Sequence, residues 1–314
     1  MLDQQTRTSL VPFVEKKWWY FGISLATIIP GLIFLMLGGL KLGVEFQGGS
    51  LLEARFERPP AVAEMKDVFT QLGHPEATIQ GADGGRMQVR TIEMSAEEIG
   101  ATQRVLAQRY PSNYRDLSAS VVSASFSGEL IQNAVYAIAL ASLLIVFLIA
   151  FGFRQFGWSA FRYGVAAILA LLHDAAVVLG LFAMLGYFFH VEVDSLFVTA
   201  VLTIIGFSVH DTIVVFDRIR ENLRVYPGEA LNPIINYSIM QTAARSVVTS
   251  LTVILTLLAL YFFGGFSIRN FALALLVGVV SGTYSSIFNA AQVVSLWQEI
   301  EDRIKRRRAQ RATA

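Results

Sequence analysis

The chain has 314 residues, of which 54% are hydrophobic and only 16% are charged, with a formal net charge of +1. Soluble globular domains carry about 25% charged residues, so this composition indicates a membrane protein. The absence of cysteine excludes a disulfide scaffold, thiolate metal sites and a cysteine nucleophile. Nucleic-acid binding needs a basic face on a soluble domain, and the one predicted soluble domain is acidic.

Six apolar runs are each long enough to cross a bilayer, which takes about 20 mostly apolar residues. They predict a bundle of six transmembrane helices at residues 19–40, 131–153, 163–189, 195–216, 247–263 and 271–294. The first run is too long for the apolar region of a signal peptide, and no small-residue cleavage site follows it. We expect residues 1–18 to form an N-terminal segment and residues 295–314 a basic tail.

The distribution of basic residues predicts the orientation of these spans. The connections on the side of the N-terminus contain Arg7, Lys16, Lys17, Arg154, Arg162, Arg218, Arg220, Arg224 and the basic residues of 303–311. The short connections on the opposite side contain little more than Lys41 and Arg269. The positive-inside rule therefore predicts that both termini are cytoplasmic. We interpret the basic run at 305–308 as an anchor on anionic membrane lipids, in preference to a nucleic-acid site.

Residues 41–130 are external in this topology and predict one small α+β domain. Strands are expected at 51–57, 78–80, 87–92 and 121–127, with helices at 61–72 and 95–110. The order β-α-β-β-α-β is typical of the ferredoxin-like split-βαβ fold. Ser95 and Glu98 predict a capping box at the second helix, and an Asp-Gly-Gly turn is expected at 83–85. The domain shows no catalytic or metal-binding constellation, and we interpret His74 as a solvated loop residue.

Ionisable residues inside the apolar runs are the strongest indication of function. A charged side chain at the bilayer centre costs about 2.5–3.5 kcal/mol, so such residues usually face a bundle interior and often mark ion pathways. The third span contains His173 and Asp174, and the fourth contains His210 and Asp211. The fifth span carries Arg245 near its start.

Asp211 and Arg245 are expected at similar depth on antiparallel neighbouring helices, where their side chains can meet. An aspartate that faces an arginine stays ionised, and one deprived of it in an apolar site takes up a proton. We therefore predict that Asp211 is a proton carrier; the alternative is a static buried ion pair that fixes helix register. For Asp174 the two interpretations are evenly balanced. His173 and His210 either relay protons near neutral pH or only pack.

The glycine-rich segment Gly-Val-Glu-Phe-Gln-Gly-Gly at residues 43–49 directly follows the first span. It has neither the lysine of a phosphate-binding loop nor a helix signal after it. We interpret Gly43, Glu45, Gly48 and Gly49 as a hinge motif between span and domain. Gly278 and Gly282 have the spacing of a small-xxx-small pair and predict close contact between helices.

Several stretches resemble the SecF family of protein-export membrane subunits, which belongs to the RND-type superfamily. The resemblance rests on residues 43–49, 207–222, 241–246, 249–252 and 282–288. The run Asp-Thr-Ile-Val-Val-Phe-Asp-Arg-Ile-Arg-Glu-Asn at 211–222 is highly specific, whereas the glycine motif alone is weak. The family usually has aspartate where this chain has Glu45, which keeps the charge and lengthens the side chain. The six-span layout with a large first external domain also matches.

This resemblance implies an auxiliary, non-enzymatic subunit that uses the proton motive force with SecD to promote preprotein translocation across the bacterial inner membrane. It implies partners in SecD, the SecY–SecE–SecG channel, YajC and the preprotein, and no cofactor. It assigns the proton path to Asp211 and Arg245. One alternative is an RND-type half-transporter for a lipid or small molecule, which requires a deep apolar pocket. Another is a membrane scaffold that only stabilises a partner.

Overall fold

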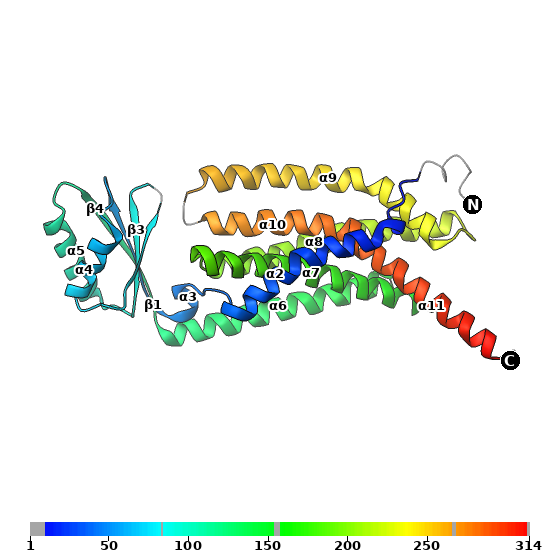
Figure 1. Cartoon of the computed structure of the whole chain (residues 1–314), viewed down its shortest axis with the longest axis horizontal. Helices are drawn as coiled ribbons and strands as arrows, with labels where there is room; N and C mark the ends of the chain where they lie inside the picture. Colours follow the sequence, from blue (N-terminus) through cyan, green and yellow to red (C-terminus); the bar gives the residue numbers. More distant parts are fainter. Residues whose placement is uncertain (1–9, 83, 154–157, 266–267, 313–314) are drawn as a thin grey trace. The chain divides into compact units, whose positions relative to one another are not determined.

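The computed structural model describes residues 10–82, 84–153, 158–265 and 268–312 (Figure 1). The expected turn at 83–85 lies in part outside the described residues. The chain divides into two compact units. The sheet unit contains residues 42–137 and 192–195, and the helical unit contains residues 1–41, 138–191 and 196–314.

The sheet unit contains a four-stranded antiparallel sheet with two helices (Figure 1). Its elements follow the order β1 (Gly49–Phe56), α4 (Val62–Gln71), β2 (Thr78–Ala82), β3 (Arg86–Thr91), α5 (Ala96–Arg109) and β4 (Tyr114–Val122). The strand order in space is β2-β3-β1-β4. This is the predicted split-βαβ arrangement, in which the first and third strands are the central pair.

The core of this unit lies on the face of the sheet that packs against α4 and α5. Alternate residues of β1 and β3 are fully buried there, because successive side chains of a strand point to opposite faces. The core comprises Leu52, Ala54, Phe56, Met65, Val68, Phe69, Ala77, Ile79, Met87, Val89, Met94 and Leu106. The other face is polar and holds a hydrogen bond from Gln88 to Glu53 at 2.6 Å.

Two expectations for this unit are corrected and one is confirmed. The last strand ends at Val122 instead of running from 121 to 127, because α6 (Ala124–Phe153) begins almost at once. Most of β4 is exposed, so its polar residues show little alternation. His74 is only 6% exposed and lies 3.3 Å from the Thr91 hydroxyl, so it is not solvated. The capping box of Ser95 and Glu98 is present.

The helical unit contains the long apolar helices α2 (Lys17–Gly38), α7 (Trp158–Phe189), α8 (Ser195–Val225), α9 (Leu231–Phe263) and α10 (Arg269–Ser285), together with most of α6. It ends with α11 (Ala291–Ala312), whose second half is polar and basic. A short 3-10 helix (Val14–Lys16) precedes α2, and a π-helical turn (Ser286–Ala290) joins α10 to α11. Within the described residues, six helices are long and apolar enough to cross a membrane, as predicted. The expected basic tail is the helical continuation α11.

Glycines allow two pairs of helix backbones to approach closely. A Cβ atom on Gly31 of α2 would lie 2.6 Å from the Cα atom of Gly180 on α7, so neither position has room for a side chain. A Cβ atom on Gly282 of α10 would lie 3.1 Å from Cβ of Ser208 on α8, and one on Gly278 would overlap Ile204. The predicted helix contact at Gly278 and Gly282 is therefore confirmed, and it brings α10 against α8.

Candidate functional site in the apolar helices

Asp174 on α7 is the centre of a buried hydrogen-bond network. Its side chain is 2% exposed. The Oδ2 atom accepts hydrogen bonds from Ser208 of α8 at 2.5 Å and from Ser285 of α10 at 2.7 Å. The Oδ1 atom accepts a hydrogen bond from Ser281 at 2.6 Å. One carboxylate therefore joins three helices, and both of its oxygen atoms have donors.

The network extends from Asp174 toward α2 through His173. The Nδ1 atom of His173 lies 3.0 Å from Oδ1 of Asp174, and its Nε2 atom lies 3.0 Å from the Ser24 hydroxyl. Ser24 in turn receives a hydrogen bond at 2.8 Å from Asn289, which lies in the π-helical turn. The ring of Tyr284 stacks on the imidazole with centroids 6.0 Å apart. His173 therefore connects the carboxylate to a second group of polar side chains.

Asp211 on α8 has a different environment. Its side chain is 4% exposed, and its Oδ1 atom lies 3.8 Å from Nδ1 of His210, whose side chain is 70% exposed. Its Oδ2 atom is buried and has no hydrogen-bond partner within the described part of the chain. A buried polar atom without a partner needs an explanation, such as a functional role, a water molecule or a bound ion. Among the described residues, Asp211 therefore has one buried carboxylate oxygen without a partner, whereas both carboxylate oxygens of Asp174 have donors.

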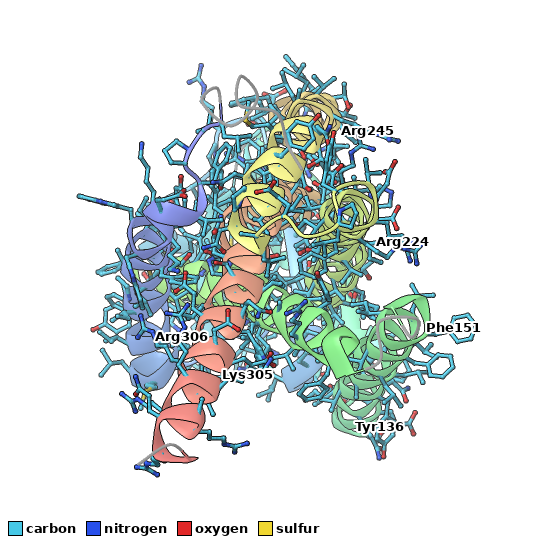
Figure 2. All side chains as sticks on the ribbon, turned by 90° about the vertical axis from the view of Figure 1, so that its right-hand side faces the viewer. Tyr136, Phe151, Arg224, Arg245, Lys305 and Arg306 are labelled. Atoms are coloured by element: carbon cyan, nitrogen blue, oxygen red, sulfur yellow. The ribbon has the colours of Figure 1, made fainter. Side chains whose placement is uncertain are left out.

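Arg245 does not pair with Asp211, which corrects our expectation. Its side chain is exposed and lies at the periphery of the helices (Figure 2). The inward face of α9 is instead formed by Thr242, Ser246 and Ser250, which are buried. The predicted depth of a residue along a helix does not fix the rotation of that helix, and here the rotation turns Arg245 outward.

The serines that surround Asp174 were not predicted to be its hydrogen-bond partners. Ser281 and Ser285 are four residues apart and lie on one face of α10, where a helix presents residues i and i+4 side by side. On α8, Ser208 lies three residues before Asp211, so these two residues also share one face of their helix. Small polar residues at helical spacing within an apolar run were the available signal.

The hinge-motif residues Gly43, Glu45, Gly48 and Gly49 form a folded segment in the sheet unit. Val44–Gln47 is one helical turn, α3, and Gly48 follows it with φ of 77°. Gly49 has φ of 118°, and a Cβ atom there would lie 2.5 Å from the carbonyl oxygen of Thr91. The Glu45 carboxylate accepts a hydrogen bond at 2.5 Å from the backbone N–H of Ser195, the first residue of α8.

Among the described residues, no group of three or more histidine, cysteine, aspartate or glutamate side chains could hold a metal ion. The carboxylate and imidazole groups inside this apolar bundle can exchange protons and form hydrogen bonds. Such groups in membrane helices are typical of ion-coupled transport proteins.

Comparison with known proteins identifies the family. The family described as "Protein export membrane protein SecD/SecF, C-terminal" matches residues 102–300, and the "SecD/SecF GG Motif" matches residues 33–60. The chain is 47% identical to Protein translocase subunit SecF of Thermobaculum terrenum, over 92% of this chain and 94% of that protein. It is 40% identical to the SecF subunit of Anaerolinea thermophila, over 93% of this chain and 96% of that protein.

Fused proteins and a solved structure extend this result. Protein translocase subunit SecDF of Bacillus subtilis is 34% identical over 91% of this chain, which spans 38% of that protein. The crystal structure of SecDF from Thermus thermophilus is similar with a TM-score of 0.83 and 32% identity, covering 93% of this chain and 39% of that chain.

The fold and the matched regions define a multi-pass membrane protein of the SecD/SecF class. Within this class, the chain belongs to the SecF family of protein translocase subunits. Relatives that carry SecD and SecF in one chain indicate SecD as the partner of the unfused form.

Proposed function

We propose that this SecF-family protein is a non-enzymatic subunit of the Sec protein-export machinery that, together with SecD, uses the proton motive force to promote preprotein translocation. Family membership supports the auxiliary role in export, because its relatives are named protein translocase subunits. The coupling to protons is supported by the chemistry of the buried aspartates.

The observation that carries the proton role is the unpaired Oδ2 atom of Asp211 in the interior of the helices. Burying an ionised carboxylate without a partner is costly, so such a group exchanges between a neutral protonated form and a charged form that has a cationic or wet neighbour. His210, which is exposed and adjacent, is suited to deliver or remove that proton. Arg245, exposed on α9, is placed to act in the complete complex instead of within this chain.

Asp174 and His173 form the fixed end of the proposed path. With both oxygens hydrogen-bonded, Asp174 holds a constant position, and Ser208 lies one turn of α8 before Asp211. Thr212 lies 2.8 Å from the Ser286 hydroxyl, which donates to the backbone carbonyl of Ser208 at 3.2 Å. A change of charge at Asp211 therefore occurs beside the hydrogen bonds that hold α8 against the π-helical turn.

The chain leaves apolar helix surfaces uncovered, which supports the proposal that it has neighbours in the membrane. In the most apolar 18-residue stretch of α6 none of the residues is buried, and in that of α9 only 17% are buried. The aromatic side chains of Tyr136 and Phe151 on α6 are exposed (Figure 2). Such helices need lipid or other helices around them. SecD, the SecY–SecE–SecG channel, YajC and membrane lipids are the proposed neighbours, and the preprotein is the proposed substrate.

The proposed location is the bacterial inner membrane, with both termini in the cytoplasm and the sheet unit outside. The excess of basic residues at one end of the helices supports the cytoplasmic placement of both termini. Lys305 and Arg306 belong to this group and are exposed on α11 (Figure 2).

The test is the substitution Asp211→Asn, compared with Asp217→Asn on the same helix. The Asp217 side chain is 55% exposed and pairs with Arg220, so it is a surface control. At fixed SecD in inverted vesicles, we expect Asp211→Asn to assemble normally and to lose the stimulation of export that an uncoupler abolishes. Wild-type stimulation in that variant would exclude the proton role. If Asp211→Asn and Arg245→Leu act only by lowering the amount of co-purified SecD, the protein is a scaffold.

A second candidate, an RND-type half-transporter for a lipid, has one observation in its favour. An apolar pocket of about 380 Å³ is lined by α9 and α10, including Val247, Leu251, Ile254 and Tyr284. Photo-crosslinking from positions 60–120 to a stalled preprotein separates the two functions. Crosslinks there support export, and their absence together with lipid bound in the pocket supports the half-transporter.

A further inference from the structure

The glycine motif is tied to the loop between α7 and α8. Leu42 and Val193 form a parallel β-bridge, and the backbone N–H of Gly43 donates a hydrogen bond at 2.7 Å to the carbonyl oxygen of Val193. A Cβ atom on Gly43 would lie 3.1 Å from that oxygen, so the two backbones are in close contact. The four residues 192–195 accordingly cluster with the sheet unit, although Ala137, the nearest residue of its other segment, lies 55 positions earlier in the sequence.

Two side-chain interactions strengthen this connection. The guanidinium of Arg90, on the central strand β3, forms an ion pair with Glu192 and donates a hydrogen bond at 3.3 Å to the carbonyl oxygen of Leu42. Both partners of the ion pair are largely shielded, with side chains 20% and 29% exposed. Arg90 therefore holds the sheet, the glycine motif and the α7–α8 loop together through one charged group.

Glu45 connects the same segment to the start of α8. The first N–H groups of a helix have no partner within the helix, and the helix dipole favours a negative charge at that end. The Glu45 carboxylate accepts a hydrogen bond from the first of them, at Ser195. Hydrogen bonds to an ionised acceptor are short and strong. The helix that begins at Ser195 continues without a break through Ser208 and Asp211.

We infer that residues 42–45, Arg90 and 192–195 form a clasp that transmits displacement of the sheet unit to α8, with Glu45 as a positioning residue. This inference rests on the proposed function and adds a mechanical connection between the external domain and the helix that carries Asp211. A helix resists compression and bending, so a displacement of its first residue moves the rest of the helix with it. A displacement of Ser195 is therefore expected to shift the polar contacts of Ser208 and the position of Asp211 on the same helix. The second route from the sheet is α6, which follows β4 directly.

The first test uses hydrogen–deuterium exchange on the full-length chain in complex with SecD, without preprotein or gradient. Glu45→Gln replaces a charged acceptor by a weaker neutral one, and a hydrogen bond to a charged group exceeds a neutral one by roughly a factor of ten in local opening. We therefore expect Glu45→Gln to speed exchange about tenfold at residues 42–49 and at the first turn of α8. Glu53→Gln, on the polar face of β1, is the matched control and leaves both segments unchanged. Equal exchange in the Glu45 variant and the wild type would overturn the clasp.

The second test measures coupling along α8. Asp211→Asn is expected to change exchange at residues 42–49, and this effect is expected to disappear in the Glu45→Gln background. An unchanged effect in both backgrounds, or none in either, would refute transmission through the clasp. Because no export is measured, the result is independent of the proton role. Normal export by Asp211→Asn with intact coupling would refute only the proposed function.

The third test replaces the clasp by a covalent bond. The chain has no cysteine, so Leu42→Cys with Val193→Cys introduces a single possible pair. Bridged strands lie about 4.8 Å apart, which a disulfide can span. We expect oxidation to restore export stimulation in the Glu45→Gln background and reduction to remove it again. Failure of the oxidised form to restore it, in a complex where Glu45→Gln impairs export, would show that Glu45 acts by another route.

Discussion

The same substitution to leucine is expected to destabilise the protein at Asp174 and to leave its stability almost unchanged at Asp211. Asp174→Leu removes an acceptor for Ser208, Ser281, Ser285 and His173 and leaves those groups in an apolar interior. Interhelical hydrogen bonds in membrane proteins average about 0.6 kcal/mol, with a maximum near 1.7 kcal/mol. For four such contacts we expect Asp174→Leu to reduce the free energy of unfolding by about 2 kcal/mol, and by up to about 7 kcal/mol if each reaches the maximum.

Asp211→Leu is the matched comparison. It removes a buried carboxylate whose Oδ2 atom has no partner and whose Oδ1 atom lies 3.8 Å from an exposed histidine. Replacing an unpaired buried polar group by an apolar one is close to neutral or stabilising. We therefore expect a change of less than about 1 kcal/mol in the free energy of unfolding.

The assay is reversible denaturation of the full chain in detergent micelles, followed by tryptophan fluorescence, with Asp217→Asn as surface control. The reasoning predicts that Asp174→Leu is the more destabilised variant and that Asp174→Asn falls between it and the wild type, since an amide retains one acceptor. Equal stability of the Asp174 and Asp211 variants would show that the serine network does not hold the helices together.

Two further predictions concern the sheet unit. Hydrogen bonds from the backbone N–H of Ser95 and then from its hydroxyl lower the pKa of Glu98 below the usual glutamate value of 4.5. The ionised Glu98 carboxylate therefore contributes its full stabilisation above pH 4.5, and this stabilisation is lost as the pH falls through the lowered pKa. The protection of the α5 amides against exchange, relative to the intrinsic rate at each pH, should therefore fall in acid, and Ser95→Ala should weaken that pH dependence. Gly49→Ala places a Cβ atom 2.5 Å from the Thr91 carbonyl oxygen at φ of 118° and should lower unfolding free energy by about 1–3 kcal/mol. Gly100→Ala within α5, where a Cβ atom meets nothing within 4 Å, should be neutral or stabilising in the same denaturation experiment.

The sequence by itself determined the class of the protein. Six apolar runs of span length force helices, because backbone polar groups in lipid must be satisfied within each segment. Alternation in the strands and the capping box at Ser95 are local signals, so the sheet unit was predictable up to its last strand. The burial of Asp174 and Asp211 followed from their place inside such runs.

Only the tertiary structure decided which polar groups meet. The depth of a residue in a span follows from counting along the chain, whereas the rotation of each helix depends on how all the helices pack. Arg245 was therefore expected beside Asp211 and faces outward, while three serines that were not singled out surround Asp174. The hydrogen bond of Glu45 to Ser195 joins residues 150 positions apart. Interactions of such sequence separation arise from the packed chain, because local pattern carries no information on where a distant segment lies.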